Sequence, residues 1–280
     1  MKTLQDRVAV ITGAGSGIGR SLAIQLADAG CKLALADINE AGLKEVSDSL
    51  KGKGVNVLAE KLDVADREAV YAFADAVKTH FGAAHIIVNN AGVALGATVE
   101  DASYDDMEWL MGINFWGVVY GTKAFLPILK QAEEGHIVNI SSVFGLIGVP
   151  TQSAYNAAKF AVRGFTESLR QELEIEGSHV SATSVHPGGI KTNIAKAARM
   201  NDTSQITGMD SETSRQEFEK LFRTSPDDAA RAIIKGIRGN QRRVLIGPDA
   251  RIIDTMARTM PTFYQRLMVS GQKMLKRRNA

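Results

Sequence analysis

Near its N-terminus the sequence places a glycine-rich turn between a short apolar strand and a helix. Residues 7–12 are mostly β-branched or apolar, the turn occupies residues 13–19, and apolar residues then recur at helical spacing over 18–29. Glycines at 13, 17 and 19 allow the backbone to turn tightly and to approach a pyrophosphate, whose charge is stabilised at a helix N-terminus. A strand that leads through such a turn into a helix predicts a nucleotide-binding α/β unit.

Strand-like and helical segments continue to alternate along the chain. Strands are expected at residues 32–37, 55–62, 85–89, 136–141, 180–185 and 244–246, and helices at 66–81, 103–132, 153–172 and 226–239. This alternation is typical of a parallel sheet covered by helices on both faces. We therefore expect an α/β protein with a Rossmann-type, doubly wound parallel sheet of about seven strands. One domain is expected over residues 1–280, with its core at about 7–247 and a C-terminal helical extension at about 250–278.

Small or polar residues follow the ends of the predicted strands. They are Gly13, Asp37, Asp63, Asn90, Ser142 and the Pro187-Gly188 turn. Ligands of open parallel sheets bind beyond the carboxyl ends of the strands. We expect these residues to converge at one edge of the sheet.

Asp37 ends the second predicted strand, about twenty residues beyond the glycine turn. A carboxylate at that point can accept hydrogen bonds from adenosine ribose hydroxyls and repels a 2′-phosphate. Neither Ser16 nor Ile38 supplies a cation for such a phosphate, so the sequence favours NAD over NADP. In the alternative interpretation, Asp37 only caps the helix that begins near Glu40.

Tyr155 and Lys159 are four residues apart on a predicted helix, so their side chains project from one face. A neighbouring ammonium favours the phenolate and lowers the pKa of a tyrosine from its usual value near ~10, which suits proton transfer near neutrality. Ser142, at the end of the preceding strand, is placed to hydrogen-bond the same substrate oxygen. Because such a Tyr-Lys pair also occurs by chance on many helices, the interpretation depends on the surrounding motifs.

The assembled motifs resemble those of the short-chain dehydrogenase/reductase family. They are Thr12-Gly13-x-x-x-Gly17-x-Gly19, Asp63-Val64, Asn89-Asn90-Ala91-Gly92, Asn114, Ser142, Tyr155-x-x-x-Lys159 and Pro187-Gly188 with Thr192. They span residues 7–246 in the family's order and spacing. The glycine spacing is similar to that of the single-domain members rather than of the extended, sugar-nucleotide branch.

The resemblance implies a catalytic set of Asn114, Ser142, Tyr155 and Lys159. Tyr155 would exchange a proton with the substrate oxygen, and Ser142, rather than the adjacent Ser141, would orient that oxygen. Lys159 would lower the pKa of Tyr155 and bind the nicotinamide ribose, and Asn114 would hold a water that relays protons to Lys159.

The resemblance also implies a set of cofactor-binding residues. These are Gly13, Ser16, Gly17, Ile18, Gly19, Asp37, Asp63, Val64, Asn90, Tyr155, Lys159, Ile190 and Thr192. In this scheme Asp63 and Val64 face the adenine and Asn90 lies along the adenosine ribose. Thr192 and the backbone of Ile190 contact the nicotinamide carboxamide.

Residues 193–225 are polar, carry scattered methionines and lack clear periodicity, which is typical of a lid over a substrate. Apolar residues are frequent near Ser142 and within this lid. They are Val143, Phe144, Leu146, Ile147 and Val149 near Ser142, and Ile194, Met200, Ile206 and Met209 in the lid. Such a pocket favours a hydrophobic ketone or secondary alcohol over a sugar. We therefore predict an NAD-dependent oxidoreductase that interconverts a secondary alcohol and a ketone by hydride transfer.

Two alternatives remain open at the level of sequence. The first is a 3-oxoacyl-carrier-protein reductase, in which Lys191, Lys196 and Arg199 would meet an acidic carrier. The second is a nucleotide-binding protein without turnover, which the intact catalytic set disfavours.

Composition argues against several other classes of function. A net charge of +2 does not indicate a nucleic-acid partner. A polar N-terminus and the lack of a long apolar run predict a cytoplasmic protein. Five histidines without ligand spacing suggest no metal site, and the single cysteine, Cys31, is expected in the core.

Residues 252–278 place apolar side chains at roughly helical spacing around Pro261 and end in Lys276-Arg277-Arg278. An amphipathic basic helix can lie on an anionic membrane surface, but packing on its own domain or another subunit is the more frequent outcome. The family resemblance further implies a homodimer or homotetramer paired through the helices around Asn114 and Tyr155.

Overall fold

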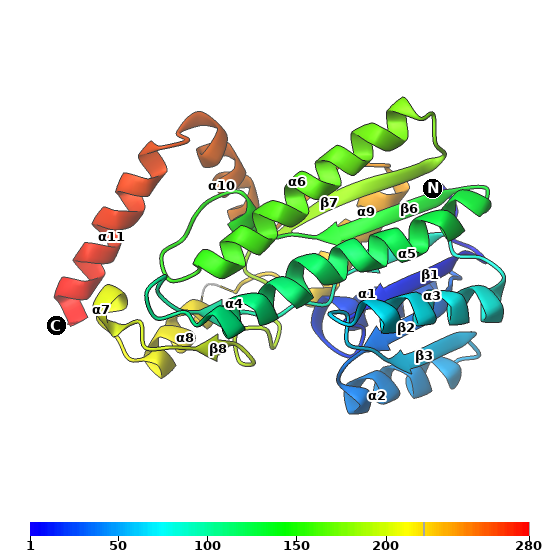
Figure 1. The fold of residues 1–280 in the computed structure, drawn as a ribbon, viewed down its shortest axis with the longest axis horizontal. Helices are drawn as coiled ribbons and strands as arrows, with labels where there is room; N and C mark the ends of the chain where they lie inside the picture. The colour runs from blue at the N-terminus through cyan, green and yellow to red at the C-terminus, as the bar shows by residue number, and fades with distance from the viewer. Residues whose placement is uncertain (221, 280) are drawn as a thin grey trace.

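The computed structural model describes residues 1–220 and 222–279. Its centre is a seven-stranded, fully parallel sheet with the strand order β3-β2-β1-β4-β6-β7-β9 (Figure 1). The strands are β1 (Val8–Thr12), β2 (Lys32–Asp37), β3 (Val57–Lys61), β4 (Ile86–Asn89), β6 (Gly135–Ile140), β7 (Val180–Pro187) and β9 (Arg243–Ile246). The predicted doubly wound α/β fold is confirmed, and the order reverses between β1 and β4, where such sheets bind ligands.

Helices cover both faces of this sheet. They are α1 (Gly17–Asp28), α2 (Glu40–Lys51) and α9 (Pro226–Arg238) on one face, and α3 (Arg67–Phe81), α5 (Gly117–Gln131) and α6 (Ser153–Ile175) on the other. The predicted boundaries differ from the observed ones by a few residues at most, apart from the segments described below.

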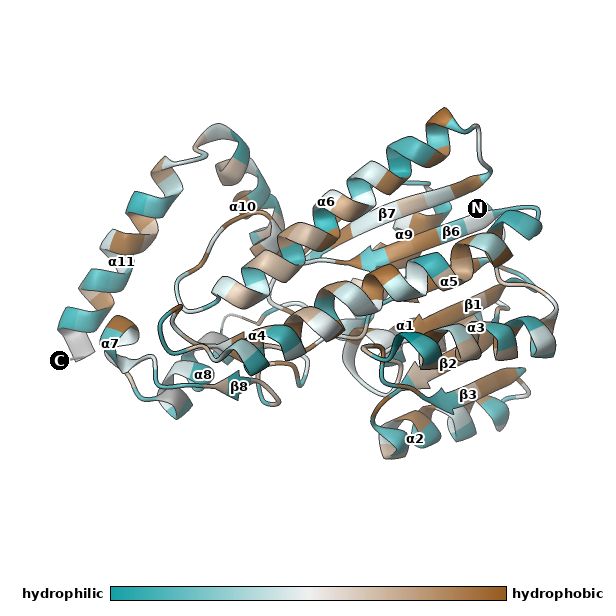
Figure 2. Ribbon diagram, viewed as in Figure 1, coloured by the Kyte–Doolittle hydropathy of each residue, from teal (hydrophilic) through white to brown (hydrophobic). Residues whose placement is uncertain are grey.

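Two hydrophobic clusters hold the helices to the sheet, because successive side chains of each strand point to opposite faces. In β1, Ala9 and Ile11 belong to one cluster and Val8 and Val10 to the other. The central strand β1 is accordingly hydrophobic along its length, whereas β3 ends in hydrophilic residues and most helices are hydrophobic on one side only (Figure 2).

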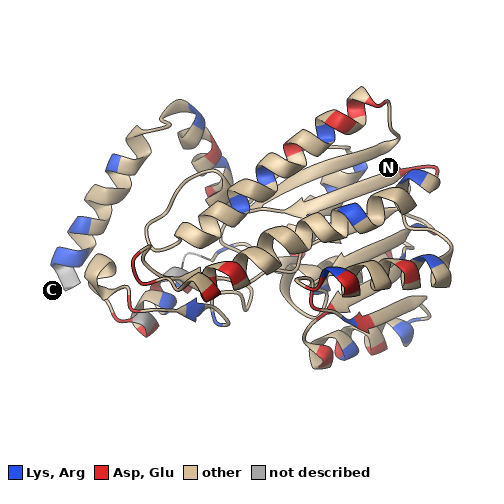
Figure 3. Cartoon of the chain, viewed as in Figure 1, with Lys and Arg blue, Asp and Glu red and all other residues tan. Residues whose placement is uncertain are grey.

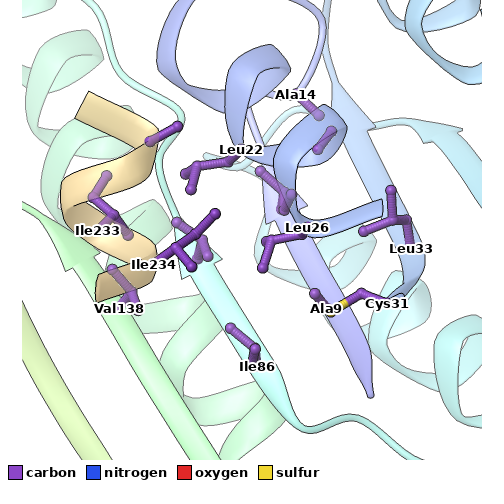
Figure 4. Packing of buried hydrophobic residues seen from close by; sticks show 14 of the residues in the cluster. Ala9, Ala14, Leu22, Leu26, Cys31, Leu33, Ile86, Val138, Ile233 and Ile234 are labelled. Carbon is purple, nitrogen blue, oxygen red and sulfur yellow. The ribbon is translucent and has the colours of Figure 1, made fainter. Parts of the chain in front are cut away.

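The interface between α1 and α9 shows this packing in detail. Leu22 and Leu26 of α1 lie opposite Ile233 and Ile234 of α9 above the strands (Figure 4). Burial of one such side chain contributes about 1.5–3 kcal/mol. Cys31 lies at the edge of the same cluster, where burial raises the pKa of its thiol to about 12. It is a core residue, as predicted.

The single helix predicted over residues 103–132 is interrupted. It is divided into α4 (Tyr104–Met111), a π-helical turn η1 (Gly112–Trp116) and α5. Glycine at 117 permits close packing here, because a Cβ at that position would lie 2.8 Å from Cγ2 of Val64. Asn114 lies within the π turn, a type of helix distortion that is frequent at functional sites.

Residues 193–225 are more regular than the sequence suggests. They contain β8 (Arg199–Met200), α7 (Ser204–Thr207) and α8 (Ser211–Lys220), and β8 pairs in parallel with β5 (Leu95–Gly96). The expectation of an irregular segment is wrong, because α8 is largely polar and a two-residue strand leaves no periodic pattern. The pairing with β5 holds the segment across the carboxyl edge of the main sheet.

The C-terminal extension forms α10 (Pro248–Thr259) and α11 (Phe263–Asn279), which are separated around Pro261. Helix α11 stands apart from the sheet, with α7 beside its C-terminal half (Figure 1). Its charged residues are all basic, whereas both signs are mixed over the rest of the fold (Figure 3). No helix among residues 1–220 and 222–279 combines the length and the apolar character needed to cross a bilayer.

Candidate active site

The turn after β1 has the conformation expected of a nucleotide-binding loop. Gly13 and Gly17 have φ of 65° and 50°, which side chains other than that of glycine adopt only with strain. A Cβ at Gly19 would lie 2.0 Å from the carbonyl oxygen of Gly13, so this position also requires glycine. Ser16 is exposed and makes no capping bond to α1, and Ile18 packs on the core beneath the turn. This open helix N-terminus fits a pyrophosphate.

Asp37 lies beside that turn at the end of β2. Its Oδ2 accepts a hydrogen bond from the backbone N–H of Gly15 at 2.8 Å, and its Oδ1 accepts one from Asn39 N–H at 2.8 Å. The cap of α2 is instead Asn39, whose side chain accepts from Gly42 N–H. The alternative interpretation of Asp37 as a helix cap is therefore wrong.

Asn90 joins the end of β4 to the glycine turn. Its Nδ2 donates to the carbonyl oxygens of Thr12 and Gly13 at 2.9 and 3.1 Å. Both amide hydrogens are thereby used within the protein, so the main observed role of the side chain is to fix the turn. Of the predicted adenine-facing pair, Asp63 is exposed, whereas Val64 is buried against Gly117.

The segment after β7 crosses above the same turn. The backbone N–H of Thr192 donates to the carbonyl oxygen of Ile190, which is itself buried. A Cβ at Gly17 would lie 3.0 Å from Cγ2 of Thr192, so these two segments lie in contact. Asp249 of α10 fixes the Pro187-Gly188 turn by accepting from Gly189 N–H at 2.7 Å. This role of Asp249 was not predicted, because no local pattern links it to a turn 60 residues earlier.

Ser142, Tyr155 and Lys159 come together at the carboxyl end of β6. Ser142 hydrogen-bonds the Tyr155 side chain, and Nζ of Lys159 lies 5.5 Å from the centroid of the tyrosine ring. Lys159 is 4% exposed and donates to the carbonyl oxygen of Ile140 at 3.0 Å. The predicted grouping of these three side chains is confirmed.

The protonation of this group differs from the expectation. Burial raises the pKa of Tyr155 to about 12, and the hydrogen bond with Ser142 opposes that rise. Burial also lowers the pKa of Lys159 to about 8. Burial dominates the pKa of Tyr155 and Lys159 does not lower it, so the expected lowering by Lys159 is wrong for this arrangement. Tyr155 is consequently protonated at neutral pH, which is the form that donates a proton.

The two adjacent serines have different surroundings. The hydroxyl of Ser141 donates to the carbonyl oxygen of Lys159 at 2.8 Å, and a Cβ at Gly145 would lie 2.4 Å from it. Ser141 is therefore enclosed between β6 and α6, whereas Ser142 faces Tyr155. This contrast agrees with the choice of Ser142.

Asn114 lies close to Lys159, but its side chain hydrogen-bonds the backbone of Val93. Its Oδ1 accepts from Val93 N–H and its Nδ2 donates to the Val93 carbonyl oxygen, both at 2.8 Å. A Cβ at Gly92 would lie 3.2 Å from Oδ1 of Asn114 and 3.7 Å from Nζ of Lys159. Gly92 thus keeps space between the amide and the ammonium.

Two supporting residues were not singled out from the sequence. Nδ1 of His186 donates to the carbonyl oxygen of Ser142 at 3.0 Å, and burial lowers the pKa of His186 to about 4. Asn156 binds the backbone of Phe144, Ile147 and Val149 and so shapes the segment between Ser142 and Tyr155. The only available signal for Asn156 was a polar residue on the buried side of a helix.

The expected apolar wall is mainly core. Val143, Leu146 and Ile147 are buried, while Phe144 and Val149 keep partly accessible side chains. Phe144 also meets the ring of Tyr155 edge to face, with centroids 6.0 Å apart. No group of three or more His, Cys, Asp or Glu that could hold a metal ion occurs among the described residues.

Comparisons with known proteins agree with this geometry. SadH of Mycobacterium tuberculosis, provisionally named an oxidoreductase, is 50% identical over 272 residues, 97% of each chain. The C alpha-dehydrogenase of Sphingobium sp. is 35% identical over 257 residues, covering 90% of this chain and 84% of that protein. A short chain dehydrogenase/reductase from Burkholderia phymatum, solved in complex with NAD, superimposes with a TM-score of 0.85 at 32% identity, covering 92% of this chain and 95% of that one. The family model described as short chain dehydrogenase matches residues 7–203, and the chain therefore belongs to this family of oxidoreductases.

Proposed function

We propose that the protein is an NAD-dependent oxidoreductase that interconverts a hydrophobic secondary alcohol and a ketone. The observation that carries this proposal is the hydrogen bond between Ser142 and Tyr155 above the buried ammonium of Lys159. This group lies at the same sheet edge as the glycine turn, so a substrate carbon beside Tyr155 also lies within reach of a nucleotide held there.

The side chains divide the remaining chemistry among them, while a bound nicotinamide supplies the hydride acceptor or donor. In the reducing direction, Ser142 hydrogen-bonds the carbonyl oxygen and Tyr155 gives it a proton. In the oxidising direction, Tyr155 takes the hydroxyl proton back. The lowered pKa of Lys159 allows a proton to leave it near neutral pH, which suits a relay of protons to and from Tyr155.

The fixed carboxylate of Asp37 supports the preference for NAD. Both of its oxygens are oriented by backbone N–H groups and each keeps capacity for a further hydrogen bond from a ribose hydroxyl. A negative charge held in place also opposes a 2′-phosphate. The related protein from Burkholderia phymatum was solved with NAD.

Of the three basic residues that suggested the carrier-protein alternative, Lys191 and Lys196 are exposed, whereas Arg199 is held within the molecule. Arg199 pairs with Asp106 at 2.7 Å and stacks on the ring of Trp109 at 3.7 Å. Its charge is therefore engaged within the molecule. A hydrophobic substrate is supported by Phe144 beside Tyr155, and a dehydrogenase reaction is supported by the name of the related C alpha-dehydrogenase.

A panel of ketones and secondary alcohols, assayed with both cofactors by absorbance of the reduced nicotinamide, tests this function. We expect turnover of apolar substrates with NAD or NADH, and a loss of about 10²–10⁴-fold in Tyr155→Phe. Binding of NADH, measured by fluorescence, should persist in that variant. Full activity of Tyr155→Phe, or turnover only of hydrophilic polyols, would refute the proposal.

We also propose that the protein assembles as a homodimer or homotetramer through the face formed by η1, α5 and α6. Trp116 and Phe160 are 46% and 41% exposed on this face, and Trp116 stacks with Tyr120. Exposed aromatic side chains of this kind are enriched at subunit interfaces. Light scattering of the wild type and Trp116→Glu tests it: a wild-type monomer contradicts the assembly, and an unchanged mass in the variant contradicts this interface.

A further inference from the structure

We propose that α11 forms the outer wall of a subsite for an apolar arm of the substrate, and that Gly271 keeps this subsite open. The inference rests on the proposed function, because it extends the same substrate beyond the reacting carbon. It concerns a part of the chain that lies beyond the family model, which ends at residue 203.

A cavity of about 250 Å³ lies between the segment that follows Ser142, the short helix α7 and α11. Its apolar lining comes from all three: Val149, Pro150, Ile206, Met268, Gly271 and Leu275. Whole ligand pockets usually measure ~300–1,000 Å³, so this volume suits one arm of a ligand.

Three polar side chains border the cavity, those of Thr151, Thr207 and Gln272, and the last two are already engaged. The hydroxyl of Thr207 donates its one hydrogen to the carbonyl oxygen of Thr203 or of Met209 and accepts from Met209 N–H, and Nε2 of Gln272 donates to the carbonyl oxygen of Ile206. Few hydrogen-bonding groups are thus left for a polar ligand. A hydrocarbon chain or ring is the ligand chemistry that this lining favours.

The cavity is attached to the segment that carries the reacting groups. Val149 donates its backbone N–H to Oδ1 of Asn156, the neighbour of Tyr155, at 3.0 Å. One residue earlier, the N–H of Gly148 donates to the hydroxyl of Tyr264 at 3.0 Å. Tyr264 is 7% exposed and lies at the start of α11, so it fixes this helix against the segment between Ser142 and Tyr155.

The sequence of α11 matches this position. Tyr264, Met268, Gly271 and Leu275 follow one another at spacings of four, three and four residues, so they lie on one face of the helix. Three of them line the cavity, and Tyr264 contacts Gly148. At its other end, α11 is held to α7 by hydrogen bonds from Lys276 to Gln205 and from Gln272 to Ile206.

The backbone conformation at Gly271 does not require glycine. It lies within a helix, its φ is not positive, and a Cβ built there meets no atom within 4 Å. A glycine inside a helix costs about 1 kcal/mol relative to alanine. The structural consequence of the missing side chain is the open space in the cavity wall.

The test compares Gly271→Leu with wild type on two methyl ketones, 2-butanone and 2-decanone, using NADH. We expect kcat/KM for 2-decanone to fall by about tenfold or more, which corresponds to about 1.4 kcal/mol of lost binding. The value for 2-butanone should stay within about twofold, because this ketone does not reach the cavity. The control Ser270→Leu places the same side chain on a neighbouring exposed position of α11 and should change neither value.

Equal effects of Gly271→Leu on both ketones, or none on either, would overturn the subsite. Thermal unfolding checks that the variants fold. If Gly271→Leu does not fold, Gly271→Ala replaces it, because a Cβ at this position meets no atom within 4 Å. A smaller loss of kcat/KM that is confined to 2-decanone then supports the subsite. The absence of such a selective loss overturns it.

Direct binding separates this inference from the proposed function. If wild type turns over neither ketones nor alcohols, the proposed function fails, and 2-decanol is then titrated into both proteins by calorimetry. Binding to wild type that is weakened in Gly271→Leu would retain the subsite. No binding to wild type, or equal binding to both, would overturn it.

Discussion

Asp37 and Gly15 are joined by a 2.8 Å hydrogen bond in which the backbone N–H of the glycine turn donates to a carboxylate oxygen at the end of β2. The same carboxylate also accepts from Asn39 N–H. Asp37 therefore has two separable properties: an acceptor that fixes the turn and a charge that faces the proposed ribose position. An amide at this position has one acceptor oxygen, so it can keep the hydrogen bond from Gly15 N–H while it loses the bond from Asn39 N–H and the negative charge.

We predict that Asp37→Asn lowers the affinity for NADH by about tenfold and narrows the gap between NADH and NADPH. Hydrogen bonds to a charged group contribute about 1.5–3 kcal/mol, and the charge also repels the 2′-phosphate. Asp37→Ala should additionally destabilise the fold, because the N–H of Gly15 loses its acceptor. Fluorescence titration with both reduced cofactors measures the change. An unaltered NADH-to-NADPH ratio in folded Asp37→Asn would restrict Asp37 to fixing the turn.

The adjacent serines provide a matched pair. We predict that Ser142→Ala reduces kcat by about 10²-fold with little change in stability, because it removes the hydroxyl beside Tyr155. Ser141→Ala should instead lower the free energy of unfolding by about 1–3 kcal/mol, because the buried carbonyl oxygen of Lys159 loses its hydroxyl donor. Urea unfolding and steady-state kinetics on both variants separate the two effects. The reverse pattern would assign the substrate contact to Ser141.

The fold could be predicted because its signals are local and repeated. Apolar strands, glycine turns and helical periodicity are visible within short windows, and strict alternation leaves few topologies other than a parallel sheet. The small sheet of β5 and β8 could not be predicted, because each strand has two residues and the pairing joins Leu95 to Arg199 across a long stretch of sequence. The π turn around Asn114 was also missed, since helical periodicity does not distinguish it from an α-helix.

The site was predictable to the extent that motif spacing determines which side chains meet. The positions of Ser142, Tyr155 and Lys159 are examples. Electrostatics were not predictable, because burial decides the pKa of Tyr155 and burial depends on distant segments. Supporting contacts such as Tyr264 with Gly148, which are 116 residues apart, likewise depend on the tertiary structure alone.

Gly92 allows the space between Asn114 and Lys159 to be probed without touching either side chain. We predict that Gly92→Ala lowers kcat by about 10-fold while NADH binding and stability change little, because the new Cβ would lie 3.2 Å from Oδ1 of Asn114 and 3.7 Å from Nζ of Lys159. If this space serves proton transfer to Lys159, the pH dependence of kcat should shift as well. Gly164→Ala is a control, because a Cβ at this position of α6 meets no atom within 4 Å. Unchanged kcat and pH profile in Gly92→Ala would argue against a relay at this point.

Two buried histidines should make the fold sensitive to mild acid. Burial lowers the pKa of His136 to about 3 and that of His186 to about 4, both below the usual 6.5. The hydroxyl of Thr183 donates its hydrogen to the carbonyl oxygen of Gln241, so it accepts a hydrogen bond from Nε2 of His136. His136 is thus buried as a neutral imidazole that carries its hydrogen on Nε2.

Above pH 6.5 both histidines are neutral in the folded and unfolded chains, so they cause no pH dependence there. Below that pH the unfolded chain binds protons first, and stability falls as the pH approaches 4, by up to about 1.4 kcal/mol per pH unit for each histidine. Urea unfolding between pH 7 and 5 should therefore show decreasing stability. His186→Gln should reduce the slope, whereas the exposed His179→Gln should not. A stability independent of pH over this range would mean that both histidines gain protons without unfolding.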